Sequence, residues 1–173
     1  MTNQQAVIYR HHQTADGRTF IQATLNSEKS LNALNQAMID SLLPNLTKWQ
    51  DDDSVVGILL DSAGDKAFCA GGDIVKLYEA MKANPHGEQP YVEQFFTHEY
   101  QLDHLIHTYK KPIVLWGNGF VMGGGLGLMA GASHRVVTEN SRVAMPEITI
   151  GLYPDVGGTY FLNQMPDKLG LFL

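Results

Sequence analysis

The sequence predicts an α/β fold with crossover connections between its strands. Short apolar runs alternate along the chain with longer stretches of helical periodicity, which is the order that builds βαβ units. Hydrophobic residues make up 44% and charged residues 17% of the 173 residues, which indicates a packed core rather than disorder. The length predicts a single domain over residues 1–173, or part of a longer one.

The first predicted element is a β-hairpin. Residues 6–13 and 18–25 have the composition of strands, and Ala15-Asp16-Gly17 between them supplies the turn. Asn26 or Ser27 is expected to cap the segment that follows, because short polar side chains accept hydrogen bonds from free N–H groups at a helix start.

The next elements follow from spacing and from breakers. Residues 33–49 carry apolar side chains at helical intervals, and Pro44 is expected to bend or split this helix. A short apolar strand follows at residues 55–60. In chain order, the remaining predictions are a helix at 73–82, a helix at 91–109, a strand at 113–116, a helix at 124–132 and a strand at 135–138; residues 141–144 are a further strand candidate.

Composition and charge exclude several classes of protein. The formal net charge is −6, whereas a sequence-independent nucleic-acid binder needs a basic surface. A single cysteine permits neither an internal disulfide nor a cysteine-rich metal site. Residues 1–10 lack a basic segment followed by an apolar one, so we expect no secretory signal and a cytoplasmic location.

Residues 112–133 form an uncharged segment long enough to span a bilayer. Seven of its 22 residues are glycine, so its hydropathy is modest. We therefore interpret it as a buried strand followed by a tightly packed helix, and expect no membrane partner.

Two glycine-rich turns, at residues 67–73 and 117–125, each connect a strand to a helix. Such turns present free N–H groups that suit an oxyanion or a phosphate. They also occur simply as turns and packing positions. Gly125 to Ala130 match the dinucleotide-binding spacing G-x-G-x-x-A, but the predicted helix is too short for that unit.

Two carboxylates stand out because their surroundings are apolar. Glu147 and Asp155 follow proline-containing turns, and such acids serve either as bases and nucleophiles or as buried hydrogen-bond acceptors. His104 and His107 lack a metal-binding partner motif and are interpreted as solvated helix residues. Cys69 is interpreted as a small buried side chain rather than a nucleophile.

Five segments together resemble the enoyl-CoA hydratase/isomerase (crotonase) superfamily, in the right order over nearly the whole chain. These are residues 29–34 (KSLNAL), 66–74 (KAFCAGGDI), 119–125 (GFVMGGG), 145–147 (MPE) and 151–158 (GLYPDVGG). The resemblance implies a spiral of ββα units, of which this chain is the N-terminal portion.

Within this superfamily, residues 127 and 155 resemble those of the branch that hydrolyses short 3-hydroxyacyl-CoA thioesters. Hydratases of the superfamily carry a catalytic glutamate at the position of Gly127 and a glycine at the position of Asp155. The resemblance implies hydrolysis of a thioester such as 3-hydroxyisobutyryl-CoA, a step of valine breakdown, to the free acid and CoA. CoA enters as part of the substrate, and no metal or redox cofactor is implied.

The resemblance also implies roles for individual residues. The thioester carbonyl would lie between the N–H groups of Gly72 and Gly124, Glu147 would be nucleophile or general base, and Asp155 would orient substrate or water. Glu99 would contact the acyl group, although a solvated helix position is an equal alternative. The implied substrate-binding residues along the CoA path are Lys29, Leu31, Ala70, Asp73 and Ile74.

The sequence ends at residues 168–173, KLGLFL, inside an apolar helical pattern, which indicates a domain that continues further. Three functional hypotheses therefore remain open: a CoA-thioester hydrolase or its N-terminal portion, a hydratase or isomerase, and a non-catalytic acyl-CoA-binding fragment. A homo-oligomer is compatible with each of them.

Overall fold

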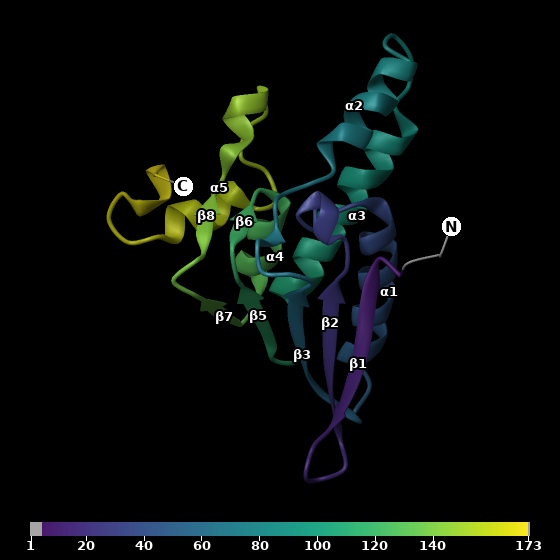
Figure 1. Ribbon diagram of the computed structural model, residues 1–173, viewed down its shortest axis with the longest axis vertical. Coiled ribbons are helices and arrows are strands. Elements are labelled where there is room, and N and C mark those ends of the chain that lie inside the picture. Colours follow the sequence, from purple (N-terminus) through teal and green to yellow (C-terminus); the bar gives the residue numbers. More distant parts are fainter. Residues whose placement is uncertain (1–4, 173) are drawn as a thin grey trace.

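The computed structural model describes residues 5–172, so residues 1–4 of the N-terminal segment and residue 173 of the final apolar run lie outside the description. A five-stranded sheet is the centre of the fold, in the order β1-β2-β3-β5-β7 (Figure 1). Its strands are β1 (Val7–Gln13), β2 (Thr19–Leu25), β3 (Val55–Ser62), β5 (Ile113–Gly117) and β7 (His134–Val137). Only β1 and β2 are antiparallel, and every other pairing in this sheet is parallel.

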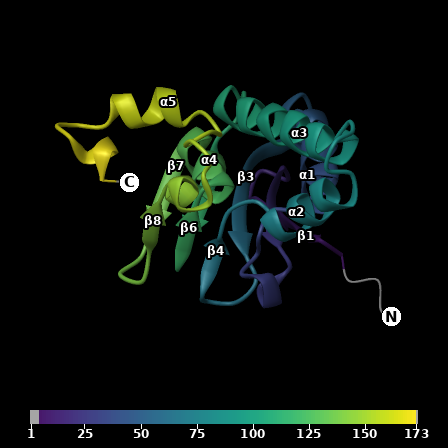
Figure 2. The same ribbon diagram turned by 90° about the horizontal axis from the view of Figure 1, so that it is seen from above.

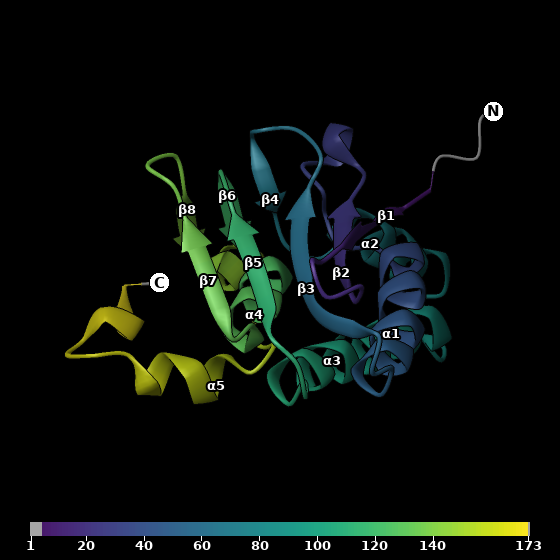
Figure 3. The same cartoon turned by 90° about the horizontal axis from the view of Figure 1, so that it is seen from below.

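A second, three-stranded parallel sheet lies beyond the ends of the central strands (Figure 3). It is formed by β4 (Ala67–Cys69), β6 (Phe120–Met122) and β8 (Arg142–Ala144). The strand candidate at 141–144 forms β8, whereas β4 and β6 occupy segments that the sequence assigns to turns. Strands of three residues are too short to show an alternating pattern, so periodicity does not find them.

Residues 5–172 contain five α-helices, of which the first four lie between strands and the fifth follows β8. They are α1 (Gln36–Gln50), α2 (Ile74–Ala83), α3 (Pro90–His107), α4 (Gly124–Gly131) and α5 (Gly158–Phe161). Short 3-10 helices are η1 (Glu28–Ser30), η2 (Pro146–Ile150), η3 (Leu162–Gln164) and η4 (Leu169–Leu171). The long helix α3 packs against both α1 and α4, which places it over the site described below (Figure 2).

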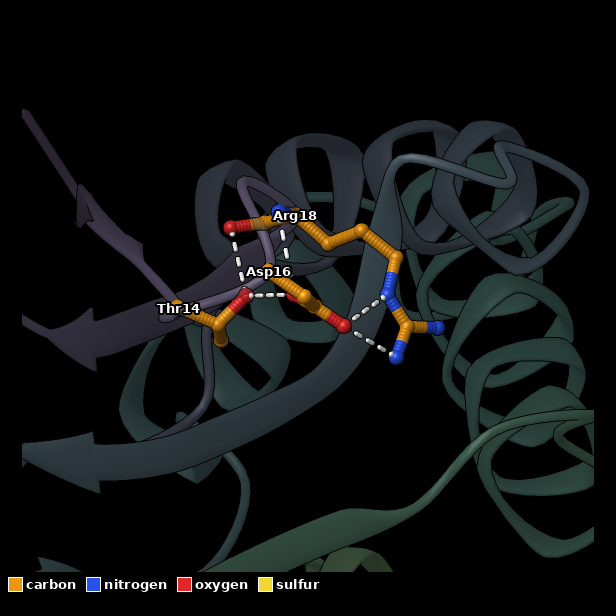
Figure 4. A network of polar contacts seen from close by, with 3 residues as sticks. All are labelled: Thr14, Asp16 and Arg18. Atoms are coloured by element: carbon orange, nitrogen blue, oxygen red, sulfur yellow. Dashed lines mark hydrogen bonds and ion pairs between the residues drawn. The ribbon is translucent and has the colours of Figure 1, made fainter.

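The predicted hairpin is confirmed, and a polar network closes its turn (Figure 4). The Thr14 hydroxyl donates to Oδ1 of Asp16 at 2.5 Å and Arg18 Nε donates to Oδ2 at 2.8 Å. The Arg18 guanidinium and the Thr14 hydroxyl hold the pKa of the Asp16 carboxyl below its usual range.

Two expectations near the first helix are wrong in part. Ser27 occupies the N-cap position of η1, but its side chain accepts no N–H there, and α1 is capped by Asn35, whose side chain accepts from the N–H of Met38 at 3.0 Å. Pro44 does not split the helix, which is continuous from Gln36 to Gln50. Pro44 lies on the exposed face, where water can bond the carbonyl that its missing N–H leaves free.

The uncharged segment 112–133 forms β5, β6 and α4, as a buried strand followed by a packed helix. No helix within residues 5–172 has both the length and the apolar character needed to cross a membrane. The apolar side chains of Leu171 and Phe172 are exposed at the end of η4, where the sequence predicts a longer helix.

Candidate active site

One cavity of about 490 Å³ brings together every residue that the sequence nominates for the site. It opens where α3, the start of α4, η2 and the loop after β4 meet. The nominated residues that line it are Lys29, Leu31, Ala70, Gly72, Asp73, Ile74, Glu99, Gly124, Glu147 and Asp155. A larger cavity of about 1230 Å³ is lined by residues of α3, α4 and the 153–166 segment, and Asp155 borders both cavities.

Two backbone N–H groups form the centre of the smaller cavity. Those of Gly72 and Gly124 donate to no backbone or side-chain acceptor within residues 5–172. They belong to different loops that lie close together, because a Cβ built on Gly124 would be 3.6 Å from the nitrogen of Gly72. Two free donors at adjacent loops, one of them at the first residue of α4, are the arrangement that stabilises an oxyanion.

The loop that carries Gly72 is held at both sides by Leu34. The N–H of Leu34 donates to the carbonyl of Gly71 at 2.8 Å, and the N–H of Asp73 donates to the carbonyl of Leu34 at 2.8 Å. Gly71 has φ +104°, a conformation that favours glycine. The backbone itself therefore fixes this loop, and the N–H of Gly72 between the two bonded residues keeps no acceptor within residues 5–172.

The Glu147 carboxylate lies beside the second loop. A Cβ on Gly123 would be 2.6 Å from Oε1 of Glu147, so a side chain there would displace the carboxylate, and the φ of +49° at Gly123 also favours glycine. Glu147 is 7% exposed, and its Oε2 has no hydrogen-bond partner within residues 5–172. Burial first and then the charge of Asp155 raise the pKa of Glu147, while a hydrogen bond to its own backbone opposes them.

Glu99 faces the same point from α3. A Cβ on Gly124 would collide with Oε1 of Glu99, and the side chain is only 2% exposed. Burial, followed by the charges of Asp155 and Glu147, raises the pKa of Glu99 to about 8. The alternative that Glu99 is a solvated helix residue is therefore wrong, and at neutral pH its carboxyl is largely protonated.

Asp155 is a third carboxyl that lines this cavity, after Glu147 and Glu99. It is 9% exposed, and its Oδ2 accepts a 2.6 Å hydrogen bond from the hydroxyl of Tyr100. Its own carbonyl accepts from the N–H of Gly158 at 2.6 Å, which ties it to the start of α5. Acids carried on α3, η2 and the 151–157 segment thus converge next to the two free N–H groups.

The predicted CoA-path residues lie around the mouth of the cavity. Lys29 and Ile74 are exposed, whereas Leu31 and Ala70 are half-buried and joined by a hydrogen bond from Ala70 N–H to Leu31 carbonyl at 3.1 Å. Asp73 also has a structural task, because its side chain caps α2 by accepting from the N–H of Lys76 at 3.3 Å.

The sequence analysis assigns no role to three residues that matter in the structure. The buried Asn32 accepts from Ser27 N–H and donates to the carbonyls of Ala63 and Ala67, each at 2.9 Å, and so fixes the 26–34 loop against β4. Tyr100 holds Asp155, and Asp103 is a buried acid one turn after Glu99. The i, i+4 spacing of Glu99 and Asp103 is the signal that could have found Asp103.

Cys69 is fully buried, as predicted, and burial raises the pKa of its thiol to about 12. His104 and His107 are exposed, as predicted. Within residues 5–172, no three His, Cys, Asp or Glu side chains are grouped in a way that could hold a metal ion.

The fold and the site define a member of the crotonase class. The family model for enoyl-CoA hydratase/isomerase matches residues 20–173, and the chain belongs to this family. The structure of an enoyl-CoA hydratase from Rhodobacter sphaeroides 2.4.1 superimposes with a TM-score of 0.86 at 39% identity, covering 97% of this chain and 48% of that one. The predicted fold is therefore confirmed, with this chain matching the N-terminal part of its neighbours.

Curated relatives refine the comparison. The mitochondrial 3-hydroxyisobutyryl-CoA hydrolase of Xenopus tropicalis is 49% identical over 150 residues, which is 87% of this chain and 38% of that protein. The small ribosomal subunit protein mS47 of Neurospora crassa is 43% identical over 86% of this chain and 29% of its own length. The chain thus spans less than half the length of these relatives.

The expected cytoplasmic location is contradicted by these relatives, since the hydrolases are named mitochondrial. One cysteine and the composition of ten N-terminal residues carry too little information to distinguish two reducing compartments.

Proposed function

We propose that the chain hydrolyses a short 3-hydroxyacyl-CoA thioester, with 3-hydroxyisobutyryl-CoA as the main substrate, to the free acid and CoA, a reaction of valine breakdown. The observation that carries the proposal is the placement of Glu147 beside two free N–H groups in a site with no acid at residue 127. The names of relatives that are 47–50% identical over 87% of the chain support the substrate.

The thioester carbonyl oxygen would accept hydrogen bonds from Gly72 and Gly124. These donors gain strength as negative charge develops on that oxygen, which is worth about 3 kcal/mol of barrier for one such donor. Neither N–H has another acceptor within residues 5–172, so neither must give up a bond when substrate arrives.

Glu147 would act on the carbonyl carbon, either directly as a nucleophile or by taking a proton from water. Its unpartnered Oε2 is available for this step, and its raised pKa makes it a better base than an exposed glutamate. As a nucleophile, Glu147 would bond to the carbonyl carbon as the C–S bond breaks, and water would then hydrolyse the resulting anhydride to release the acid and restore Glu147. As a general base, Glu147 would take a proton from the water whose oxygen bonds to that carbon as the C–S bond breaks. In both routes the CoA thiolate takes up one proton of the consumed water. No metal or redox cofactor takes part in this scheme.

Asp155 and Glu99 would position the acyl chain and the water. Asp155 is fixed by Tyr100, so it offers a carboxylate oxygen at a defined place. The largely protonated Glu99 can donate a hydrogen bond, which suits the 3-hydroxyl group or the carbonyl of the acyl chain.

Hydration of a double bond is disfavoured by the structure around residue 127. Hydration requires a second carboxylate across the site, and α4 supplies none at Gly127. A Cβ there would lie 2.6 Å from Cβ of Val156, so this position has no space for an acidic side chain in the present structure.

The test measures thiol release from 3-hydroxyisobutyryl-CoA with a thiol-reactive dye, alongside hydration of crotonyl-CoA. Glu147→Gln should abolish thiol release, whereas Glu139→Gln, an exposed glutamate in the turn between β7 and β8, should leave it unchanged. Hydration without thiol release would refute the hydrolase assignment.

The similarity to a ribosomal subunit protein favours one alternative, a non-catalytic acyl-CoA-binding or interaction fragment. Calorimetry would test whether the chain binds acyl-CoA. Binding without thiol release from any 3-hydroxyacyl-CoA would support that alternative.

A further inference from the structure

Asp155 lies where the two cavities of the site meet. Among residues 5–172, it is the only one that lines both the smaller cavity of about 490 Å³ and the larger cavity of about 1230 Å³. Its Oδ2 accepts the 2.6 Å hydrogen bond from the hydroxyl of Tyr100, which lines the larger cavity alone. The Asp155 side chain is therefore held in place at the boundary.

The same boundary passes between neighbouring residues of other segments. On α3, Glu99 lines the smaller cavity and Tyr100 the larger one. In the 151–157 segment, Leu152 lines the smaller cavity and Tyr153 the larger one. The helix α4, which packs against α3, changes from one cavity to the other within its first turn (Figure 2). The two cavities thus adjoin along one line, with Asp155 on it.

An aromatic pair on α3 adds to this boundary. Phe96 lines the smaller cavity one turn before Tyr100, and the centroids of the two rings are 5.8 Å apart. The Tyr100 ring in turn carries the hydroxyl that holds Asp155. Phe96, Tyr100 and Asp155 therefore form one wall between the cavities.

The larger cavity beyond this wall has the chemistry of an alkyl-chain site. The buried side chains of Ile106, Leu126, Met129 and Val156 line it. Apolar surface of this kind gains free energy when it covers methylene groups. The wall instead presents the carboxyl of Asp155, and methylene groups pressed against it would remove its water without replacing the hydrogen bonds. The wall thus opposes a long alkyl chain that the cavity behind it would favour.

The proposed function sets the direction of the acyl group. A thioester with its carbonyl at the N–H groups of Gly72 and Gly124, and its CoA chain in the mouth, has its acyl group among the remaining lining residues. Glu99 and Asp155 are buried carboxyls among these. A hydroxyl on a short acyl group can exchange hydrogen bonds with them. An unsubstituted longer chain would reach the wall.

We propose that Tyr100 and Asp155 are specificity-determining residues that limit the substrate to a short acyl chain, and that the larger cavity takes an alkyl chain once this wall is opened. The inference rests on the proposed function for the orientation of the thioester. It adds the element that sets the acyl length and the place where a longer chain would lie.

The test measures the Kd of butanoyl-CoA and octanoyl-CoA by calorimetry, with Glu147→Gln in every protein so that the ligand stays intact. With the wall present, the two Kd values should agree within about threefold, because the extra methylenes gain no apolar cover. With Tyr100→Ala added, octanoyl-CoA should bind at least about tenfold more tightly than butanoyl-CoA, since each buried methylene tightens binding about fourfold. Tyr100→Phe loses the hydroxyl but keeps the ring, so it is the matched control and should keep the ratio of the intact wall.

A second variant guards against a folding defect. Tyr100 is 39% exposed, so its truncation should leave the core packed, and thermal unfolding checks this. Asp155→Ala removes the side chain that lines both cavities and keeps the backbone bond to Gly158, and it should favour octanoyl-CoA in the same way.

The outcomes separate this inference from the proposed reaction. An unchanged ratio of the two Kd values in folded Tyr100→Ala and Asp155→Ala overturns the wall and leaves the hydrolase function intact. A preference for octanoyl-CoA with the wall present also overturns it. The expected Kd ratios without thiol release by the wild type refute the reaction alone, and no binding of either acyl-CoA overturns both.

Discussion

The hydroxyl of Tyr100 donates a 2.6 Å hydrogen bond to Oδ2 of Asp155, and this bond ties α3 to the 151–157 segment beside the two free N–H groups. A short bond from a hydroxyl to a carboxylate is among the stronger hydrogen bonds in proteins. It fixes one oxygen of Asp155 and leaves the other for substrate or water.

Tyr100→Phe removes this hydrogen bond and keeps the ring. A hydrogen bond to a charged group is worth about 2 kcal/mol, so we expect kcat for thiol release to fall about tenfold or more. Tyr109→Phe is the control, because that hydroxyl bonds the Leu46 carbonyl away from the site. Equal activity of the two variants would show that Asp155 needs no support from Tyr100.

Gly127→Ala tests the contact between α4 and Val156. The added Cβ would lie 2.6 Å from Cβ of Val156, so the 155–158 segment must move. We expect a loss of about 1–3 kcal/mol in the free energy of unfolding, measured with urea, and a loss of thiol release as Asp155 shifts. Adding Val156→Gly should recover stability, since it removes the colliding atoms and suits a backbone φ of +44°. A double variant no more stable than Gly127→Ala would contradict the clash.

The stability of the protein should depend on pH through Glu99. The pKa of this carboxyl rises from 4.5 to about 8 on folding, so the folded state binds more protons than the unfolded chain between these values. The free energy of unfolding should therefore decrease as pH rises from about 4.5 to 8, by at most ~1.4 kcal/mol per pH unit. Glu99→Gln should reduce this slope, and Glu93→Gln on the exposed side of α3 should not. If Glu99→Gln and Glu93→Gln show the same dependence of the free energy of unfolding on pH, the proton taken up on folding is bound by a group other than Glu99.

Cys69 should not react with thiol reagents in the native protein. The thiol is fully buried and its pKa is about 12, so little reactive thiolate forms at neutral pH. A thiol-reactive dye should label none of the folded protein and one thiol per chain in denaturant, because Cys69 is the single cysteine. Rapid labelling without denaturant would mean that β4, which carries Cys69, separates from β6 in the native protein.

The sequence predicts the long helices and strands and the residues nominated for the site. It does not predict the short strands, the helix cap or the buried contacts, because these depend on residues that are distant in the sequence. The apolar run of β3 and the spacing of α3 carry strong periodic signals, so both are predicted. The three-residue strand β4 carries none, and it depends on pairing with β6. Asn35 caps α1 rather than Asn26 because the intervening residues form η1.

For the site, glycines and acids next to prolines stand out in the sequence because they are unusual there. The burial of Glu99 is invisible in the sequence, since α3 has polar residues on several sides. Asp103 looks like an ordinary surface acid until α4 is packed against it. The partner of Tyr100 lies 55 residues away, and no local pattern links the two.

The contact between Gly127 and Val156 has a consequence for how this chemistry can change over generations. Any side chain at residue 127 of α4 would displace Val156 and with it the segment that carries Asp155. A shift of that segment away from α4, with glycine still at residue 127, would leave unfilled space beside α4. Intermediates with a single replacement lose one arrangement before they acquire the other. A side chain at residue 127 therefore fits only together with a second substitution in the 155–158 segment.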